Sequence, residues 1–235
     1  MPKAPHTRHF RFESEMAAPV IQWLQRNRLG VKSEFKTPWG ICDFVGVRFR
    51  PKRVRVRLSY GQRLAIGPPL RLQILSEIPD AEVGEPIALH RLSAGAFLSV
   101  PPDRLQNELD HLIKGKFVRS PRPNYFEKIN GWFPLHERIV AVELKLSKVA
   151  EAAAQARSNL AFATESYIAL PMDRALLLAC HPRKKQIARS GVGLLGVSST
   201  RCILLFWGKK TAEFTDEILQ AHCVERFWRT RGSSS

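Results

Sequence analysis

The run of residues 139–147 constrains the fold more than any other stretch of the 235-residue sequence. It reads Ile-Val-Ala-Val-Glu-Leu-Lys-Leu-Ser. At the two-residue period of a strand, one face is apolar throughout, whereas the other carries Glu143 and Lys145 beside Ile139 and Ala141. An apolar run of this length predicts a strand that is buried on both faces of a sheet. The two charged residues break that pattern, and such breaks are expected at functional or strained sites.

Hydrophobic periodicity predicts further elements along the chain. We expect helices at 12–28, 70–78, 87–94, 102–114, 147–164 and 215–228, and strands at 31–36, 41–48, 116–120, 125–129 and 167–170. Residues 191–197 and 202–207 predict a strand pair. Three segments stay open: 49–60 as a basic strand or an exposed connector, 174–180 as a strand or a short helix, and 183–189 as a turn or a helix. A length of 235 residues is enough for one large domain or two small ones, and a hydrophobic fraction of 44% is enough for a core.

Asp43 is a second acid on an otherwise apolar strand face, which it shares with Val45 and Val47. It could cap the preceding turn or bond the backbone, or it could bind a cation. Mg²⁺ prefers oxygen ligands and commonly takes one or two carboxylates, which Asp43 and Glu143 on neighbouring strands could supply. Mn²⁺ is expected to substitute. Glu13, on the inward stripe of the first helix, could hold outer waters of the ion or a second ion.

Lys145 follows Glu143 by two residues and shares its strand face. Its ammonium group could orient or help deprotonate an attacking water and offset the negative charge of the reacting phosphate. The alternative is a buried Glu143–Lys145 ion pair without activity, because pairing relieves only part of the cost of burying a charge.

Asp43, the Glu143-x-Lys145 motif and the alanine-rich helix that bears Gln155 together resemble the PD-(D/E)XK nuclease superfamily. The resemblance covers residues 12–48 and 135–207. It implies an α/β (α+β) restriction-endonuclease-like fold, in which a mixed sheet is flanked by helices, and magnesium-dependent cleavage of DNA. It further implies that Asp43 and Glu143 are metal ligands and that Lys145 is catalytic. Glu13 matches the acid of the family's first helix, and Gln155 matches a helix glutamine found in some branches.

The sequence departs from the family pattern at two points. Cys42 stands where a proline usually precedes the first acid, and about 100 residues separate Asp43 from Glu143, whereas a much shorter connection is usual. The intervening segment 61–134 resembles a winged helix-turn-helix, with three helices followed by two strands around a proline-rich tip. We therefore expect a nuclease-like core from 1–60 and 135–235, with an inserted winged helix at 61–134.

In the winged-helix family, the third helix enters the major groove and the wing contacts the DNA backbone. The residues that this implies as base contacts are Arg104, Asn107, His111 and Lys114, and those implied near phosphates are Lys116, Arg119, Arg122 and Lys128. Asp103, Glu108 and Asp110 on the same helix argue against this interpretation. Many winged helices mediate only protein contacts, so that alternative stays open.

The overall charge is +16, with 37 Lys and Arg against 21 Asp and Glu. This excess favours a polyanionic partner, either nucleic acid or an anionic membrane surface, although a soluble protein with a basic surface is the simpler alternative. No apolar stretch approaches the ~20 residues of a membrane span, so we expect no membrane insertion. The four cysteines are scattered without a CxxC motif, which favours reduced thiols and a cytoplasmic protein.

The sequence therefore predicts a metal-dependent DNA endonuclease that a winged helix positions on DNA. A catalytically inactive DNA-binding regulator with the same fold, or an interaction subunit of a larger DNA-processing assembly, would share the charge and the winged helix but lack metal-dependent cleavage. The protein could act as a homodimer or with a partner subunit.

Overall fold

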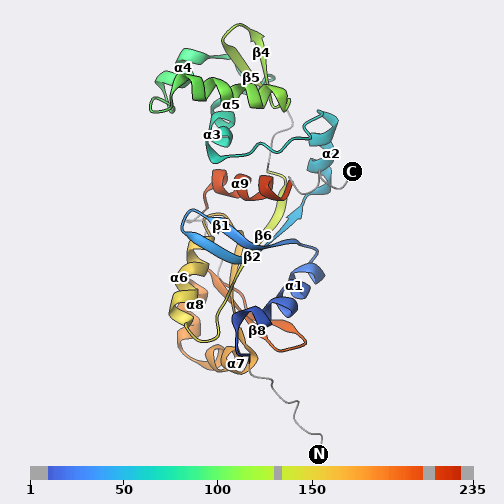
Figure 1. Ribbon diagram of the computed structural model, residues 1–235, viewed down its shortest axis with the longest axis vertical. Helices are drawn as coiled ribbons and strands as arrows, with labels where there is room; N and C mark the ends of the chain where they lie inside the picture. Colours follow the sequence, from blue (N-terminus) through green and yellow to red (C-terminus); the bar gives the residue numbers. More distant parts are fainter. Residues whose placement is uncertain (1–9, 130–133, 209–214, 229–235) are drawn as a thin grey trace, which may run out of the picture. The chain divides into compact units, whose positions relative to one another are not determined.

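A computed structural model describes residues 10–129, 134–208 and 215–228 (Figure 1). The chain forms two compact units. Residues 1–48 and 137–216 make the first, here called the sheet unit, and residues 49–136 and 217–235 make the second, here called the helical unit. These bounds differ from the predicted ones, because residues 49–60 and the C-terminal helix belong to the helical unit, whereas the sequence grouped them with the other segment. No helix of the described residues is long and apolar enough to cross a membrane.

The sheet unit is built on one six-stranded mixed sheet, which confirms the predicted α/β class. Its strand order is β1-β2-β6-β7-β8-β9. The strands are β1 (Gly30–Thr37), β2 (Gly40–Phe49), β6 (His136–Leu144), β7 (Glu165–Pro171), β8 (Val192–Val197) and β9 (Cys202–Phe206). The central strands β6, β7 and β8 pair in parallel, whereas β1 with β2 and β8 with β9 form antiparallel pairs. The predicted strand pair at 191–207 is β8 with β9.

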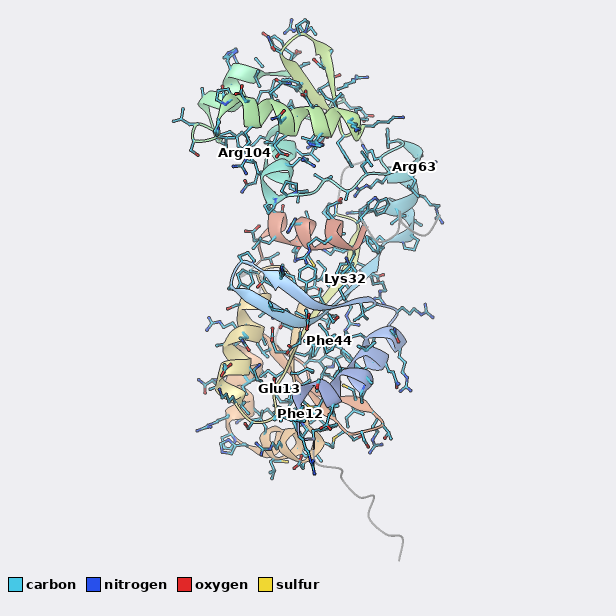
Figure 2. All side chains as sticks on the ribbon, in the orientation of Figure 1. Phe12, Glu13, Lys32, Phe44, Arg63 and Arg104 are labelled. Carbon is cyan, nitrogen blue, oxygen red and sulfur yellow. The ribbon has the colours of Figure 1, made fainter. Side chains whose placement is uncertain are left out.

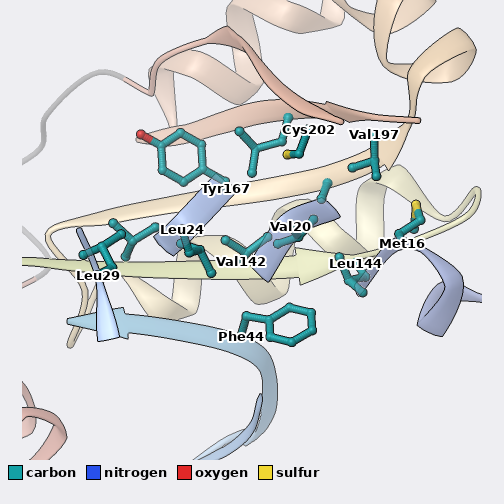
Figure 3. Packing of buried hydrophobic residues seen from close by; sticks show 13 residues of the cluster. Met16, Val20, Leu24, Leu29, Phe44, Val142, Leu144, Tyr167, Val197 and Cys202 are labelled. Carbon is teal, nitrogen blue, oxygen red and sulfur yellow. The ribbon is translucent and has the colours of Figure 1, made fainter. Parts of the chain in front are cut away.

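Helices cover both faces of this sheet. After a 3₁₀ turn, η1 (Glu13–Met16), helix α1 (Ala17–Arg26) packs Val20 and Leu24 against Val142 of β6 (Figure 3). The opposite face packs against the inner stripe of α6 (Val149–Asn159), Ala152 and Ala156, and against α7 (Met172–Cys180) and α8 (Arg183–Arg189). The two open segments at 174–180 and 183–189 are therefore helices.

β6 contains Glu143 and most of the apolar run 139–147, and residues 139–144 are buried as predicted. The strand starts earlier and ends earlier than predicted, at His136 and Leu144. Lys145 consequently lies in the connection to α6, although its backbone N–H still donates to Ala169 O of β7 at 3.1 Å. Ending the strand at Leu144 frees the lysine side chain from the strict alternation of strand faces.

The helical unit contains the element order predicted for a winged helix, with one addition. It has α3 (Pro69–Glu77), β3 (Ile87–Ala88), α4 (Leu89–Ala94), α5 (Pro102–Lys114), β4 (Val118–Arg122) and β5 (Tyr125–Lys128). The short strand β3 was predicted as part of a helix, but it pairs with β5, which gives the sheet order β3-β5-β4. Leu72, Leu105, Leu109 and Phe117 are among the buried residues that form its core.

Residues 51–59 form helix α2 (Pro51–Ser59), so the prediction of a basic strand or connector was wrong. The alternation of Arg and Val at 53–58 suggests a strand, but Pro51 suits the first turn of a helix. Val54 and Arg57, three residues apart, form the buried face. Arg57 is fully buried, and its guanidinium forms a bidentate ion pair with Glu225 of α9 (Glu217–Trp228). This partner lies 168 positions away in the sequence, so local periodicity could not reveal it.

Candidate functional site

Glu143 is the buried acid at the centre of the candidate site, with only 2% of its surface exposed. It lies near the carboxyl end of β6, where Asn159 Nδ2 of α6 donates a hydrogen bond to Glu143 Oε1 at 2.6 Å. Burial raises the pKa of Glu143 to about 7, and repulsion from Asp43 adds to the rise. The hydrogen bond from Asn159 and the charge of Lys145 act in the opposite direction. The carboxyl group is therefore poised to change protonation near neutral pH.

Asp43 projects from β2, the strand next to β6 in the sheet. Its Oδ2 accepts the backbone N–H of Leu144 at 2.7 Å. The alternative that Asp43 bonds the backbone is thus confirmed, but its partner is on β6 and not in the preceding turn. Burial raises the pKa of Asp43, the Leu144 N–H and Lys145 lower it, and Glu13 and Glu34 raise it. Since Leu144 directly follows Glu143, this hydrogen bond places the Asp43 carboxylate beside the segment of β6 that carries Glu143.

Lys145 is held at the same place by an acid from the N-terminal segment. Its Nζ lies 3.6 Å from Glu13 Oε2, while Glu13 Oε1 accepts the backbone N–H of Leu146 at 3.2 Å. Glu13 begins the 3₁₀ turn before α1, and Figure 2 labels it there. The Lys145 side chain is 15% exposed and that of Glu13 is 41% exposed. The structure therefore brings Glu13, Asp43, Glu143 and Lys145 together, as the sequence predicted.

Asn159 was not singled out from the sequence, although it contacts Glu143 directly. Trp39 Nε1, from the turn between β1 and β2, donates to Asn159 Oδ1 at 3.1 Å. A signal was present, because Asn159 continues the buried stripe of Ala152 and Ala156 at helical spacing and is its one polar member. Gln155, predicted as the catalytic helix glutamine, forms no hydrogen bond with Glu143 in the described part of the chain. Its Oε1 is buried and has no hydrogen-bond partner within the described residues.

No group of three or more His, Cys, Asp or Glu side chains in the described part of the chain is arranged to hold a metal ion. A pair of carboxylates nevertheless suits Mg²⁺, which usually keeps several waters and takes one or two protein carboxylates beside substrate phosphates. Asp43 and Glu143 fit this donor set, because the charge of Asp43 raises the pKa of Glu143 and a divalent cation would relieve that repulsion. Glu13, the third predicted ligand, contacts Lys145 and Leu146 instead.

The residues predicted to contact DNA lie on α5 and on the β4–β5 wing. Arg104, Asn107, His111 and Lys114 are all exposed on α5, as are Lys116 and Arg119 beyond it (Figure 2 labels Arg104). Asp103 and Asp110 are exposed on the same helix. The predicted base-contacting helix therefore presents charges of both signs.

The cations of the wing form more contacts within the protein than the sequence predicts. Lys128 is the clearest correction, because its side chain is 12% exposed and its Nζ lies 3.6 Å from Asp80 Oδ1. Arg119 pairs with Glu127 but stays 62% exposed. Arg122 stacks its guanidinium 3.7 Å from the centre of the Tyr125 ring. The wing thus offers less uncompensated positive charge than the sequence suggests.

Comparisons with known proteins add little to this geometry. No protein-family model matches the sequence, and no curated protein is similar to it. Among solved structures, the chain is similar to the SPO1766 protein of unknown function from Silicibacter pomeroyi, with 10% identity, a TM-score of 0.40 and 97% of each chain covered.

Proposed function

We propose that this protein is a metal-dependent endonuclease that hydrolyses phosphodiester bonds of DNA. The observation that carries the proposal is that Asp43, which accepts the N–H of Leu144, and Lys145 lie beside the buried Glu143 at the end of β6. Paired acids beside a lysine suit phosphodiester hydrolysis, since the acids can hold a cation and the lysine can stabilise negative charge in the transition state.

Each residue has a distinct part in the proposed reaction. Asp43 and Glu143 would hold a divalent cation such as Mg²⁺, which lowers the pKa of a bound water and polarises a phosphoryl oxygen. Lys145 offsets the negative charge that grows on the phosphate, and it is oriented by its ion pair with Glu13. Asn159 fixes the Glu143 carboxylate through its hydrogen bond. Burial of Glu143 strengthens the charge interactions that this carboxylate makes.

The test is cleavage of supercoiled plasmid by the full-length protein with and without Mg²⁺. Asp43→Asn should abolish Mg²⁺-dependent nicking, since it removes one of the two ligand carboxylates while keeping the shape of the side chain. Asp173→Asn is a matched control, because Asp173 is exposed in the first turn of α7. Equal nicking by the Asp43→Asn variant and the wild type would refute the assignment.

One observation favours a second function, that of a catalytically inactive nuclease-fold protein which binds DNA. Asp43 and Glu143 each accept a hydrogen bond from the protein itself, as buried acids with a purely structural role also do. This alternative predicts DNA binding by the wild type without Mg²⁺-dependent cleavage on duplex, single-stranded or branched substrates.

A further inference from the structure

The segment before the winged-helix elements has an unusual charge distribution. Residues 44–76 contain eight Lys and Arg and no Asp or Glu. Three of these cations find acids elsewhere: Arg48 with Glu137, Arg57 with Glu225 and Arg71 with Glu108. The remaining cations concentrate around the start of α2.

Arg50, Lys52 and Arg55 are exposed, and none of them forms an ion pair within the described residues. Lys52 and Arg55 are three residues apart in α2 and therefore share one helix face. Arg50 immediately precedes the helix, where its backbone N–H donates to Leu135 O at 2.7 Å. The start of α2 thus presents positive charge that no neighbouring acid compensates.

His136 lies within the influence of the same cations. Burial lowers the pKa of His136 to about 4, and repulsion from Arg50 and Arg53 contributes. The His136 Nδ1 atom is buried and has no hydrogen-bond partner in the described part of the protein. The backbone N–H groups and the dipole of the α2 amino terminus add to the same field. An anion placed here would be attracted by the cations and by the amino terminus of α2, while His136 stays uncharged near neutral pH.

The start of α2 differs from α5 and the wing, the surface that the sequence predicts to contact DNA. On α5 and the wing, Asp103 and Asp110 are exposed, and Lys128 and Arg119 are paired with acids. Lys and Arg side chains that neutralise phosphates release the counterions condensed on the DNA, and this release supplies most of the salt-dependent affinity of a DNA-binding protein. The unpaired cations at the start of α2 suit this role better than the paired cations of the wing do.

We propose that Arg50, Lys52 and Arg55, at the start of α2, form the principal phosphate-contacting surface of this protein for duplex DNA. This inference rests on DNA being the partner under the proposed function, but it does not depend on cleavage. An anionic membrane fits less well, because an interfacial helix needs one apolar face and one charged face. The outer face of α2 instead mixes Lys52 and Arg55 with Val56, and its inner face holds the buried Arg57.

The experiment compares two triple variants of the full chain that each remove three positive charges. One is Arg50→Gln, Lys52→Gln and Arg55→Gln, and the matched control is Arg104→Gln, Lys114→Gln and Lys116→Gln on and after α5. Arg53 is left intact, because its Nη1 donates to Pro134 O at 2.8 Å. Fluorescence anisotropy with a labelled duplex, repeated over a range of salt concentrations in EDTA, measures affinity and its salt dependence without cleavage.

The α2 variant should bind DNA more weakly and lower the slope of log K against log salt by about 2 to 3, as expected when three phosphate contacts are lost. The α5 control should change the slope less. The proposal would be overturned if the α2 variant lost no more DNA affinity than the control. It would also be overturned if the α2 variant lost binding to phosphatidylserine vesicles or duplex RNA but kept its binding to duplex DNA.

If the triple variant fails to fold, the Lys52→Gln and Arg55→Gln double variant, with Arg104→Gln and Lys114→Gln as control, gives the same comparison. If the wild type binds DNA without cleaving it and the α2 variant loses that binding, the nuclease proposal is refuted but the phosphate-contacting surface is supported.

Discussion

Asn159 donates a hydrogen bond of 2.6 Å to the carboxylate of Glu143, and both side chains are almost completely buried. The orientation of the Asn159 amide is fixed from its other side by Trp39 Nε1, at 3.1 Å from Asn159 Oδ1. An indole N–H can only donate, so the amide oxygen faces Trp39 and the amide nitrogen faces Glu143. The arrangement therefore presents a donor to Glu143 and favours its charged form.

Replacing Asn159 with leucine should destabilise the protein mainly in the pH range where Glu143 is charged. The variant keeps a similar side-chain volume but leaves a buried carboxylate without its donor, at a cost of about 1–3 kcal/mol. Urea unfolding of metal-free protein measures this, and the loss should be larger at about pH 8 than at about pH 5. Ser158→Ala, one residue earlier on the exposed side of α6, is the control and should change stability little. A loss that is the same at both pH values would contradict this account.

The raised pKa of Glu143 predicts a pH dependence of stability with a definite sign. Between its usual 4.5 and about 7, the folded protein holds this proton more tightly than the unfolded chain does. The contribution of Glu143 to stability is therefore fully present below about pH 4.5 and is lost as pH rises toward 7. The full effect is about 3 kcal/mol, at 1.36 kcal/mol for each unit of pKa.

Glu143→Gln isolates this contribution, because glutamine Oε1 can still accept the hydrogen bond from Asn159. The stability difference between the variant and the wild type, measured by urea unfolding in EDTA, should grow in favour of the variant as pH rises from about 4.5 to 7. His136 has the opposite dependence, since its pKa is lowered to about 4 and its contribution is lost as pH falls from 6.5. Taking the difference between the two proteins cancels the His136 contribution. A difference that stays flat across this range would show that Glu143 titrates normally.

The buried ion pair between Arg57 and Glu225 should be important to the stability of the helical unit. Removing one partner leaves an uncompensated buried charge, so Arg57→Met should cost about 3–5 kcal/mol. The double variant Arg57→Met and Glu225→Met should lose less than the sum of the single variants, since no charge is left unpaired. Chemical unfolding of all four proteins gives the coupling energy.

Arg48→Met is the control for this cycle. Arg48 pairs with Glu137 at 2.9 Å, but the two side chains are 32% and 47% exposed, so its loss should cost at most about 1 kcal/mol. Additive losses in the Arg57 and Glu225 cycle would mean that the two side chains do not interact in solution.

The sequence predicted the parts of the fold that local patterns encode. The buried run at 139–144 became β6, and its violation at Glu143 pointed to the site, because a charge in an apolar strand is visible without any partner. Asp43 and Glu13 were likewise identified because each is a polar residue on an otherwise apolar face. Helices with clear periodicity, such as α5, also lie where they were predicted.

The features that the sequence missed depend on partners far away in the chain. The Arg and Val alternation at 53–58 suggested a strand, but Arg57 is buried by Glu225 and Trp228, which belong to the last helix. Asn159 was missed because its role depends on Glu143 and Trp39, which lie 16 and 120 positions away. Lys128 was predicted to contact phosphate, because its ion-pair partner Asp80 lies 48 positions earlier in the chain and no local pattern shows the pair. In each case tertiary pairing overrides what a local pattern indicates.

The central claim is that Asp43 and Glu143 converge on a single divalent cation, and calorimetric titration with Mn²⁺ tests it most directly. The account predicts one site in the wild type that is lost in both Asp43→Asn and Glu143→Gln and kept in Asp173→Asn. Binding should weaken as pH falls below about 7, because protons then compete with the cation for Glu143. Wild-type protein that binds no Mn²⁺, or variants at Asp43 and Glu143 that bind it as the wild type does, would contradict the account.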